Sequence, residues 1–379
     1  LKALGYVQHG FDKMLFLKRD DSGELVSAIL VYVDDFLGVY RSDYDLEAVK
    51  KAFTWGSFEN LDTNKPVTFK GKRLTVFQEE GRHKIRIDQS EFIAGLGKLR
   101  LPKGRLSGAP LLTEEERGEF RSISGCLQWL CGQSRPELSA VVSLSNKGLQ
   151  TTPQDLKNLY DAAAYAQETH SGGIVLQDVP LNKASVIMSY ADSSWANAED
   201  LRSQFGVLVL LTTPKAAQEA TKGFVLDWRS GRSTRVCRST LAAEASAADE
   251  ACDRGAFLNM YLSEILYAVP AHRVGPRLLH LHATDAKSLY DCTIQENPNL
   301  SDKRSLVNVR AIQEVIAPNR LHWVPTQLQF ADGLTKIDKE LQARFHEWLQ
   351  SPTVVLSAQA QGSFAKENST SVKLVQASP

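Results

Sequence analysis

The stretch Ser189-Tyr190-Ala191-Asp192-Ser193-Ser194-Trp195 closes an apolar run that begins at Val186. Its β-branched and aromatic residues predict a buried strand that ends at a carboxylate. Two further apolar runs follow along the chain, Phe205–Leu211 and Gly223–Trp228, and each is bounded by polar or glycine-containing segments. The three runs together predict a β-meander at the start of a domain.

A long helix is predicted next, from about Thr240 to Ala268, with Ser239 in place to cap its first turn. The remaining periodic segments predict, in order, a strand at Leu278–Ala283, helices at Ala286–Cys292 and Ser305–Ile316, a strand at Leu321–Val324 and a helix at Lys339–Leu349. Strands that come first and then alternate with helices predict a mixed α/β (α+β) domain, with a five-stranded mixed sheet and flanking helices. From Ser351 onward no period is visible, and we expect a disordered tail.

Four carboxylates occupy special places in this predicted layout. Asp192 and Asp285 end strands, Glu244 lies on the apolar edge of the long helix, and Asp332 follows the last strand. Acids near a core are costly unless something compensates their charge. A pair of divalent cations about 4 Å apart would compensate it, and an all-oxygen set suits Mg²⁺ or Mn²⁺ better than zinc. The alternative is four unrelated surface acids in a chain that has 44 acidic residues.

The front of the chain contains a second acidic feature, Asp34-Asp35, between the apolar runs Leu25–Val33 and Phe36–Tyr40. This arrangement predicts a tight β-hairpin with both aspartates at the turn. Adjacent carboxylates are typical of a cation site, although a solvated Asp-rich turn is the alternative.

The middle of the chain is predicted to change from short elements to helices. We expect a helix at Asp43–Phe53, a strand pair at Val67–Phe77 around Gly71, a helix at Ser90–Leu99 and a linker at Leu101–Pro110. Residues from Glu114 to Ala166 then look helical, with breaks at Arg135-Pro136 and at Thr151–Pro153, where Thr152 would be the cap and Pro153 the first helical residue.

Charge and cysteine content indicate which partners and which redox environment the chain suits. The chain has 379 residues and zero net charge, so any nucleic-acid contact must come from local clusters. Basic residues outnumber acidic ones between Lys65 and Arg105, and arginines precede the long helix; a solvated face is an equal alternative in both places. The candidate phosphate contacts are Lys70, Lys72, Arg73, Arg229, Arg232, Arg235 and Arg238. Five scattered cysteines without a C-x-x-C pair argue against zinc and indicate a reducing, intracellular setting. No apolar run is long enough to span a bilayer.

Several of these segments resemble copia-type retrotransposon Pol polyproteins. The similarity lies in Asp192-Ser193-Ser194-Trp195-Ala196, Trp228-Arg229-Ser230, Ser239-Thr240-Leu241-Ala242-Ala243-Glu244-Ala245 and Ala331-Asp332-Gly333-Leu334-Thr335-Lys336. Tyr32-Val33-Asp34-Asp35 resembles the catalytic hairpin of reverse transcriptases, and Phe120–Gly125 and Ser134–Glu137 resemble the family's segment between polymerase and nuclease.

The resemblance implies a division into four parts. These would be a partial reverse-transcriptase palm and thumb-like region at 1–110, a helical connector at 111–183, an RNase H-like domain at 184–350 and a tail at 351–379. The chain lacks an initiating Met, so we expect it to begin within a larger polypeptide. The family's polymerase uses a third aspartate on an earlier strand, so we expect Asp34 and Asp35 to be the remnant of a metal site.

For the second half, the resemblance implies an endonuclease that cuts the RNA strand of RNA–DNA hybrids. Asp192, Glu244, Asp285 and Asp332 would hold two Mg²⁺ or Mn²⁺ ions. Implied partners are the hybrid, an RNA template, a DNA primer and the upstream remainder of Pol, with no membrane, in a cytoplasmic particle or the nucleus. Two alternatives stay open: an inactive nucleic-acid-binding remnant of a retrotransposon, and a phosphatase or other metal hydrolase, which would leave the hairpin and connector unexplained.

Overall fold

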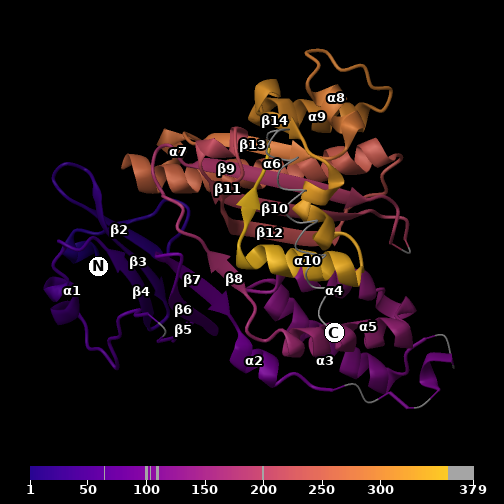
Figure 1. The fold of residues 1–379 in the computed structure, drawn as a ribbon, viewed down its shortest axis with the longest axis horizontal. Coiled ribbons are helices and arrows are strands. Elements are labelled where there is room, and N and C mark those ends of the chain that lie inside the picture. Colours follow the sequence, from indigo (N-terminus) through magenta and orange to yellow (C-terminus); the bar gives the residue numbers. More distant parts are fainter. Residues whose placement is uncertain (64, 99–100, 103, 108–110, 199, 357–379) are drawn as a thin grey trace.

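The computed structural model describes residues 1–356, apart from 64, 99–100, 103, 108–110 and 199. A five-stranded sheet forms the centre of its C-terminal half (Figure 1). In spatial order its strands are β12 (Phe224–Arg232), β10 (Gln204–Thr212), β9 (Val186–Ser194), β13 (Leu279–Thr284) and β14 (Leu321–Trp323). The first three pair antiparallel, whereas β13 runs parallel to both β9 and β14. The predicted five-stranded mixed sheet with flanking helices is therefore confirmed.

Helix α6 (Thr240–Tyr267) covers one face of this sheet. Ser239 caps it as predicted, because its side chain accepts a hydrogen bond from the backbone N–H of Ala242 at 3.1 Å. Alanines such as Ala248 and Ala251 are fully buried against the strands, so the helix packs closely on them. Beside α6 lie the short helix α7 (Ala271–Val274) and the helices α8 (Lys287–Thr293) and α9 (Lys303–Val315).

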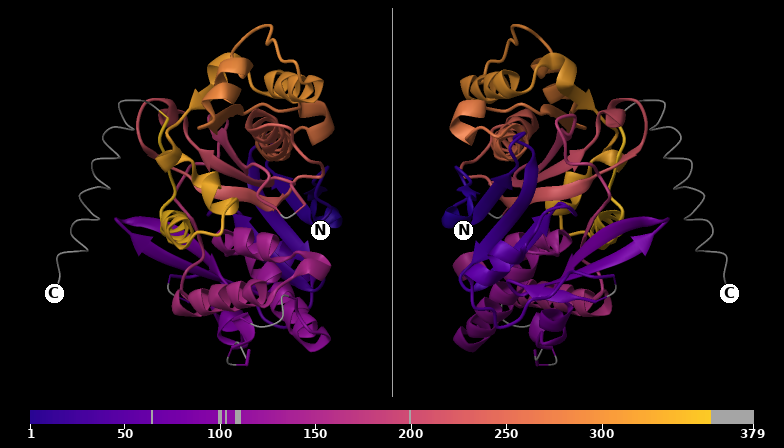
Figure 2. Two further views of the ribbon diagram at one scale, coloured as in Figure 1. Left: turned by 90° about the vertical axis from the view of Figure 1, so that its right-hand side faces the viewer. Right: turned by 90° about the vertical axis from the view of Figure 1, so that its left-hand side faces the viewer.

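Helix α10 (Lys339–Gln350) and the 3-10 helix η8 (Phe330–Leu334) cover the opposite face, and Figure 2 shows α6 and α10 on the two sides of the sheet. Phe330 stacks on Trp348, with ring centroids 4.2 Å apart, over the buried strand residues Met188 and Leu208. Because both faces are covered, the central strands consist of nearly continuous apolar residues.

The connector helices are α3 (Glu114–Cys131), α4 (Ser139–Ser145) and α5 (Pro153–Glu168). Both predicted breaks occur, and Thr152 and Asp155 form a capping box before Pro153, the first helical residue. The fully buried Arg135 and Glu137 form an ion pair between α3 and α4.

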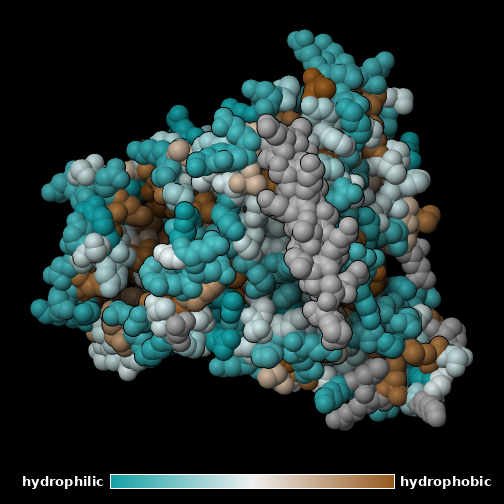
Figure 3. Space-filling model, in the orientation of Figure 1, coloured by the Kyte–Doolittle hydropathy of each residue, from teal (hydrophilic) through white to brown (hydrophobic). Residues whose placement is uncertain are grey.

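Two smaller sheets form the N-terminal half. One contains β1 (Val7–Gln8), β2 (Leu15–Arg19), β3 (Leu25–Tyr32) and β4 (Asp35–Tyr40); the other contains β5 (Val67–Phe69), β6 (Lys72–Glu79), β7 (Arg82–Asp88) and β8 (Ile174–Leu176). The helices α1 (Glu47–Ala52) and α2 (Ser90–Ala94) are shorter than predicted, and part of the predicted Ser90–Leu99 helix and of the linker lies outside the described residues. Strands β1, β2, β7 and β8 were not predicted. Apolar side chains gather on the surface over this half (Figure 3).

The first sheet packs on the C-terminal end of α6 through polar contacts. The fully buried His9 donates from Nε2 to the carbonyl oxygen of Tyr261 at 3.1 Å, and the backbone N–H of Gly10 donates to Oε1 of Glu264 at 2.8 Å. Arg19 donates to the carbonyl oxygen of Glu264 at 3.1 Å, near the end of the helix where backbone carbonyls lack helical partners.

The prediction of disorder from Ser351 onward is wrong for its first residues. Thr353–Val354 forms strand β15, which pairs antiparallel with β11 (Thr221–Lys222), and Val355 and Leu356 are buried. Residues 357–379 lie outside the described part of the chain. Among the described residues, no helix is both long and apolar enough to cross a membrane.

Candidate active site

Asp192 lies near the end of β9, where the sheet positions it opposite Gly206 of β10. The residue is only 5% exposed, and its Oδ2 accepts a short hydrogen bond from the hydroxyl of Thr335. A side chain in place of Gly206 would bring a Cβ within 2.6 Å of the carbonyl oxygen of Ala331 and 2.7 Å of the Cβ of Leu334. Glycine at this position therefore lets η8 cross close over the strand beside Asp192.

This close crossing brings Asp332, inside η8, into the same region. Asp332 is 3% exposed, and its Oδ1 forms a short ion pair with Nζ of Lys336, four residues further on. The backbone carbonyl of Thr335 accepts a hydrogen bond from Nδ2 of Asn197 at 3.2 Å, which ties the segment after η8 to the loop after β9.

Asp285 directly follows β13 and is held by the segment before η8. Its Oδ2 accepts a hydrogen bond from Oγ1 of Thr326 at 2.9 Å. Nε2 of Gln329 donates to the carbonyl oxygen of Ala191 at 2.9 Å and lies 3.5 Å from Oδ1 of Asp285. Gln329 therefore links the ends of the two strands that carry Asp192 and Asp285.

Glu244 reaches the site from the first turns of α6. The backbone N–H of Ser193 interacts with its carboxylate, but Oε2 is buried without a hydrogen-bond partner among the described residues. An unpartnered buried carboxylate oxygen costs free energy unless a ligand pairs with it.

The carboxylates interact with one another. Burial raises the pKa of Asp192, and the charges of Asp332 and Asp285 raise it further. Burial likewise raises the pKa of Glu244, with added repulsion from Asp192 and Asp285. The structure therefore brings all four predicted acids into one electrostatically coupled group, because acids repel in this way only when they are near one another.

The four acids fit a divalent cation by their chemistry but not by the present arrangement of their side chains. The all-carboxylate donor set and the unpartnered Oε2 of Glu244 suit a hard cation such as Mg²⁺. As the side chains are arranged, however, no three His, Cys, Asp or Glu residues in the described part of the chain converge to hold one ion. Hydrogen-bond donors of the protein already occupy one oxygen of each of three acids. Thr335 donates to Asp192, Lys336 to Asp332 and Thr326 to Asp285. The residues therefore fit the ion by their chemistry, although the structure does not show them converged on it.

Some of the basic residues predicted to contact nucleic acid already bind other side chains of the protein, and others line cavities. Arg73 forms a two-pronged ion pair with the buried Asp88, Lys72 donates to Oε1 of Gln133 at 2.9 Å, and Lys70 lies over the ring of Tyr32. These side chains already have structural partners.

Arg235 and Arg238 instead line a small polar cavity together with Arg304. The cavity lies between the loop before α6 and the start of α9, and Ser246, Ser305 and Asn308 also line it. One carboxylate, Asp302, also lines the cavity. The three guanidinium groups outnumber it and, with the hydroxyl and amide groups, suit an oxyanion such as a phosphate.

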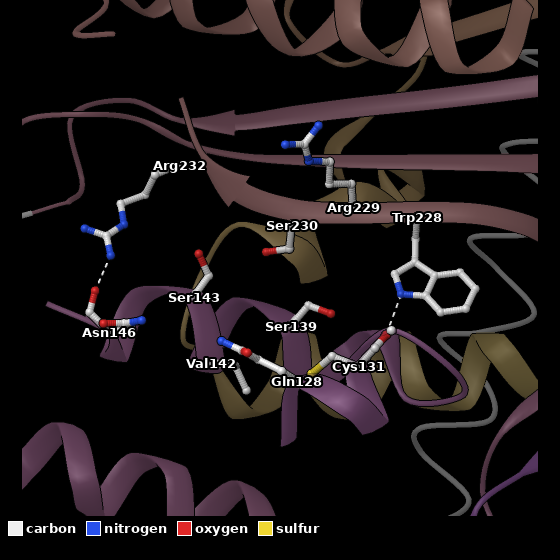
Figure 4. A pocket seen from close by; sticks show the side chains of 11 residues that line it. Gln128, Cys131, Ser139, Val142, Ser143, Asn146, Trp228, Arg229, Ser230 and Arg232 are labelled. Atoms are coloured by element: carbon white, nitrogen blue, oxygen red, sulfur yellow. Dashed lines mark hydrogen bonds between the residues drawn. The ribbon is translucent and has the colours of Figure 1, made fainter. Parts of the chain in front are cut away.

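Arg229 and Arg232 belong to β12, beside a cavity of about 370 Å³ between that strand and the connector (Figure 4). Arg229 points away from the connector and pairs with Glu250 of α6 at 2.7 Å. The guanidinium of Arg232 donates a hydrogen bond to the carbonyl oxygen of Asn146. Nε1 of Trp228 donates to the carbonyl oxygen of Cys131 at 2.7 Å. The connector is thus joined to the sheet through residues of the Trp228-Arg229-Ser230 region.

Asp34 and Asp35 lie on a different sheet from the four acids. The hairpin is confirmed, but its turn is Val33-Asp34, and Asp35 already pairs with Tyr32 as the first residue of β4. Val33 has a φ of 54°, which the tight turn requires. Both aspartates are exposed.

Four residues that contact the acids were not assigned a role from the sequence: Thr326, Gln329, Thr335 and Lys336. Thr335 and Lys336 follow Asp332 in the Ala331–Lys336 segment, so their position was a signal that could have been used. Gln329 carried no such signal, because its two partners come from strands far away in the sequence.

No protein-family model matches the sequence. Among solved structures, the fold is similar to the N-terminal RNase H domain of Rv2228c from Mycobacterium tuberculosis, with 14% identity over 42% of this chain and 96% of that domain, at a TM-score of 0.28. It is also similar to RNase H1 of Halobacterium salinarum, with 12% identity over 40% of this chain and 94% of the other and a TM-score of 0.26. A third match, the prototype foamy virus protease–reverse transcriptase, has 14% identity over 47% of this chain but only 21% of the viral one, at a TM-score of 0.24. These similarities concern the fold, and the functional proposal is argued from the residues of the site.

Proposed function

We propose that this chain contains a metal-dependent nuclease that cuts the RNA strand of RNA–DNA hybrids. One observation carries the proposal: four carboxylates from β9, α6, the end of β13 and η8 form one coupled group, with Oε2 of Glu244 buried and unpartnered. Such a group is expensive to maintain in a protein that gains nothing from a cation.

Asp192, Glu244, Asp285 and Asp332 would hold Mg²⁺ or Mn²⁺. When bound, the ions would supply Lewis-acid stabilisation of the phosphodiester and a more acidic water. The neighbouring side chains would set the geometry, since Thr335 orients Asp192, and Thr326 and Gln329 orient Asp285. Acidic site residues also favour this chemistry over zinc chemistry, which uses His and Cys ligands.

The substrate would be held by the cavity of Arg235, Arg238 and Arg304. This cavity lies beside the first turns of α6, the helix that also carries Glu244. A phosphate of the hybrid bound there would help fix the backbone relative to the carboxylates. The 2′-hydroxyl groups would distinguish the RNA strand from DNA.

The direct test incubates the full chain with end-labelled hybrid in the presence of Mg²⁺. We expect RNA cleavage that Asp192→Asn abolishes, while Asp178→Asn, which changes an exposed aspartate outside the site, leaves it intact. Thermal unfolding of both variants checks that they are folded. Absence of cleavage by the wild type, or equal cleavage by Asp192→Asn, would contradict the nuclease assignment.

The same proposal extends to the whole chain. The parent would be a copia-type Pol polyprotein, with a truncated palm and thumb-like region at 1–110, the connector at 111–183, the nuclease at 184–350 and a tail after it. Template, primer and the upstream part of Pol would be its partners, inside a cytoplasmic particle or the nucleus. The hairpin with Asp34 at its turn supports this ancestry.

An inactive hybrid-binding remnant is the second candidate. The reason to keep it is that the carboxylates do not converge as arranged. Salt-sensitive binding of the hybrid without cleavage, in Mg²⁺ and in Mn²⁺, would favour this candidate over the nuclease.

A further inference from the structure

The ammonium group of Lys336 lies at the edge of the carboxylate group. Its Nζ pairs with Oδ1 of Asp332, and its charge also interacts with Asp192 and Asp285. We propose that Lys336 is an exchangeable counterion: it neutralises the carboxylates when no metal is bound, and a divalent cation must displace it to bind. This inference rests on the proposed metal role of the four acids.

The arrangement of the acids indicates that Lys336 competes with a divalent cation for them and does not help the cation to bind. A residue that prepared a metal site would leave the carboxylate oxygens free to converge. Lys336 instead draws the side chain of Asp332 towards itself, and the adjacent Thr335 engages Oδ2 of Asp192. Consecutive residues of one short segment therefore engage two of the four proposed ligands, in a region where no three ligands converge among the described residues.

The charges agree with this role. A group of four carboxylates without a cation is strongly self-repelling. Among the leading influences on the pKa values of Asp192 and Glu244, Lys336 is the basic residue in both cases, and it stabilises the ionised form of each. One ammonium offsets part of the repulsion and leaves the group negative enough to attract a divalent ion.

Lys336 also has space to leave. Its side chain is 43% exposed and lines two cavities, one of about 390 Å³ next to Lys147 and Arg232 and one of about 360 Å³ next to Asn158 and Lys339. A displaced ammonium can therefore move into a hydrated space beside the connector without disturbing the core.

The test measures Mn²⁺ binding to the full chain by calorimetry, without nucleic acid. Removing the competing charge in Lys336→Gln should tighten Mn²⁺ binding about tenfold, and Lys336→Arg, which keeps the charge, should not tighten it. Lys339→Gln is the matched control, because Lys339 lines one of the same cavities but is not among the groups that shift the pKa of Asp192 or Glu244. It should leave Mn²⁺ affinity unchanged.

A second readout guards against a merely structural effect. In EDTA the Lys336→Gln variant should melt below the wild type, because it has lost its counterion, and saturating Mn²⁺ should raise its melting temperature by more than that of the wild type. Unchanged or weaker Mn²⁺ binding by Lys336→Gln, or no binding by either protein, would overturn the inference. Tighter binding without hybrid cleavage would support the counterion and reject the nuclease, so the two proposals fail separately.

Discussion

Nδ1 of His346, on the last helix, lies 3.1 Å from Oε1 of Glu137, the fully buried partner of Arg135. The contact joins α10 to the segment between α3 and α4, and so joins the helix after the site to the connector. Burial alone would raise the pKa of Glu137, but Arg135 and His346 outweigh it and lower that pKa. The ionised Glu137 carboxylate therefore stabilises the fold above the ordinary carboxyl pKa near 4.5, and this stabilisation is lost as the pH falls below that value.

Breaking this buried network should destabilise the protein strongly. We expect Glu137→Gln to lower the free energy of unfolding at pH 7 by about 3–5 kcal/mol, because the buried guanidinium of Arg135 loses its counter-charge. Urea unfolding provides the measurement. Glu114→Gln is the matched control, since its ion pair with Arg121 is on the surface and should contribute less than about 1 kcal/mol. Equal effects of the two substitutions would show that the network is not a major source of stability.

Neutralising Glu244 should stabilise the metal-free protein. Because the pKa of Glu244 is raised above its ordinary value, its ionised form destabilises the fold at alkaline pH, and the penalty disappears as the pH falls towards the ordinary carboxyl range. In EDTA at pH 8, Glu244→Gln should increase the free energy of unfolding by about 1–3 kcal/mol. The gain should shrink at pH 5. A gain that is the same at both pH values would mean that charge is not the cause.

Two buried histidines should make the fold sensitive to acid. Oγ of Ser189 lies 2.9 Å from Nε2 of His280 and 2.9 Å from Nδ1 of His282. Burial lowers the pKa of His280 to about 4 and that of His282 to about 3. Their contribution to stability is complete above pH 6.5 and is lost as the pH falls through that value towards the folded pKa.

The test compares urea unfolding of the wild type and His282→Gln at several pH values. The unfolding free energy of the wild type should fall more steeply below pH 6, by up to about 1.4 kcal/mol per pH unit, because the variant has one fewer histidine to protonate on unfolding. Parallel curves for the two proteins would show that His282 does not take up a proton on unfolding in this range.

Hybrid cleavage should not depend on the hairpin. Asp34 is exposed at a turn on a separate sheet, and the four acids of the proposed site come from other elements. Asp34→Asn should therefore leave the rate of RNA cleavage within about twofold of the wild type, as a surface change away from the reacting groups does. A large loss of cleavage, with unchanged thermal stability, would show that the two halves are coupled in catalysis.

Local sequence signals were enough for the strands and helices of the main sheet, and they singled out the four acids of the proposed site. Caps such as Ser239 and Thr152 fixed helix starts, and apolar runs fixed the strands of the main sheet. Strand β7 was missed because charged residues, Lys84, Arg86 and Asp88, occupy its buried or half-buried positions, so no apolar alternation is visible. Strand β15 was missed because its partner β11 lies more than 100 residues away. The donors that hold the acids could not be assigned, since Thr335 and Gln329 reach them only through the crossing of η8 over Gly206.

The docking of the first sheet on α6 has a geometric consequence. Glu264, which anchors that sheet, and Glu244, which belongs to the proposed site, are separated by about 20 residues of one uninterrupted helix, or about 30 Å at 1.5 Å per residue. Helix α6 therefore fixes the distance between the sheet that carries the hairpin and the carboxylates of the proposed site. A nucleic acid that contacted both would be held at a set spacing of about nine base steps, taking 3.4 Å for each step.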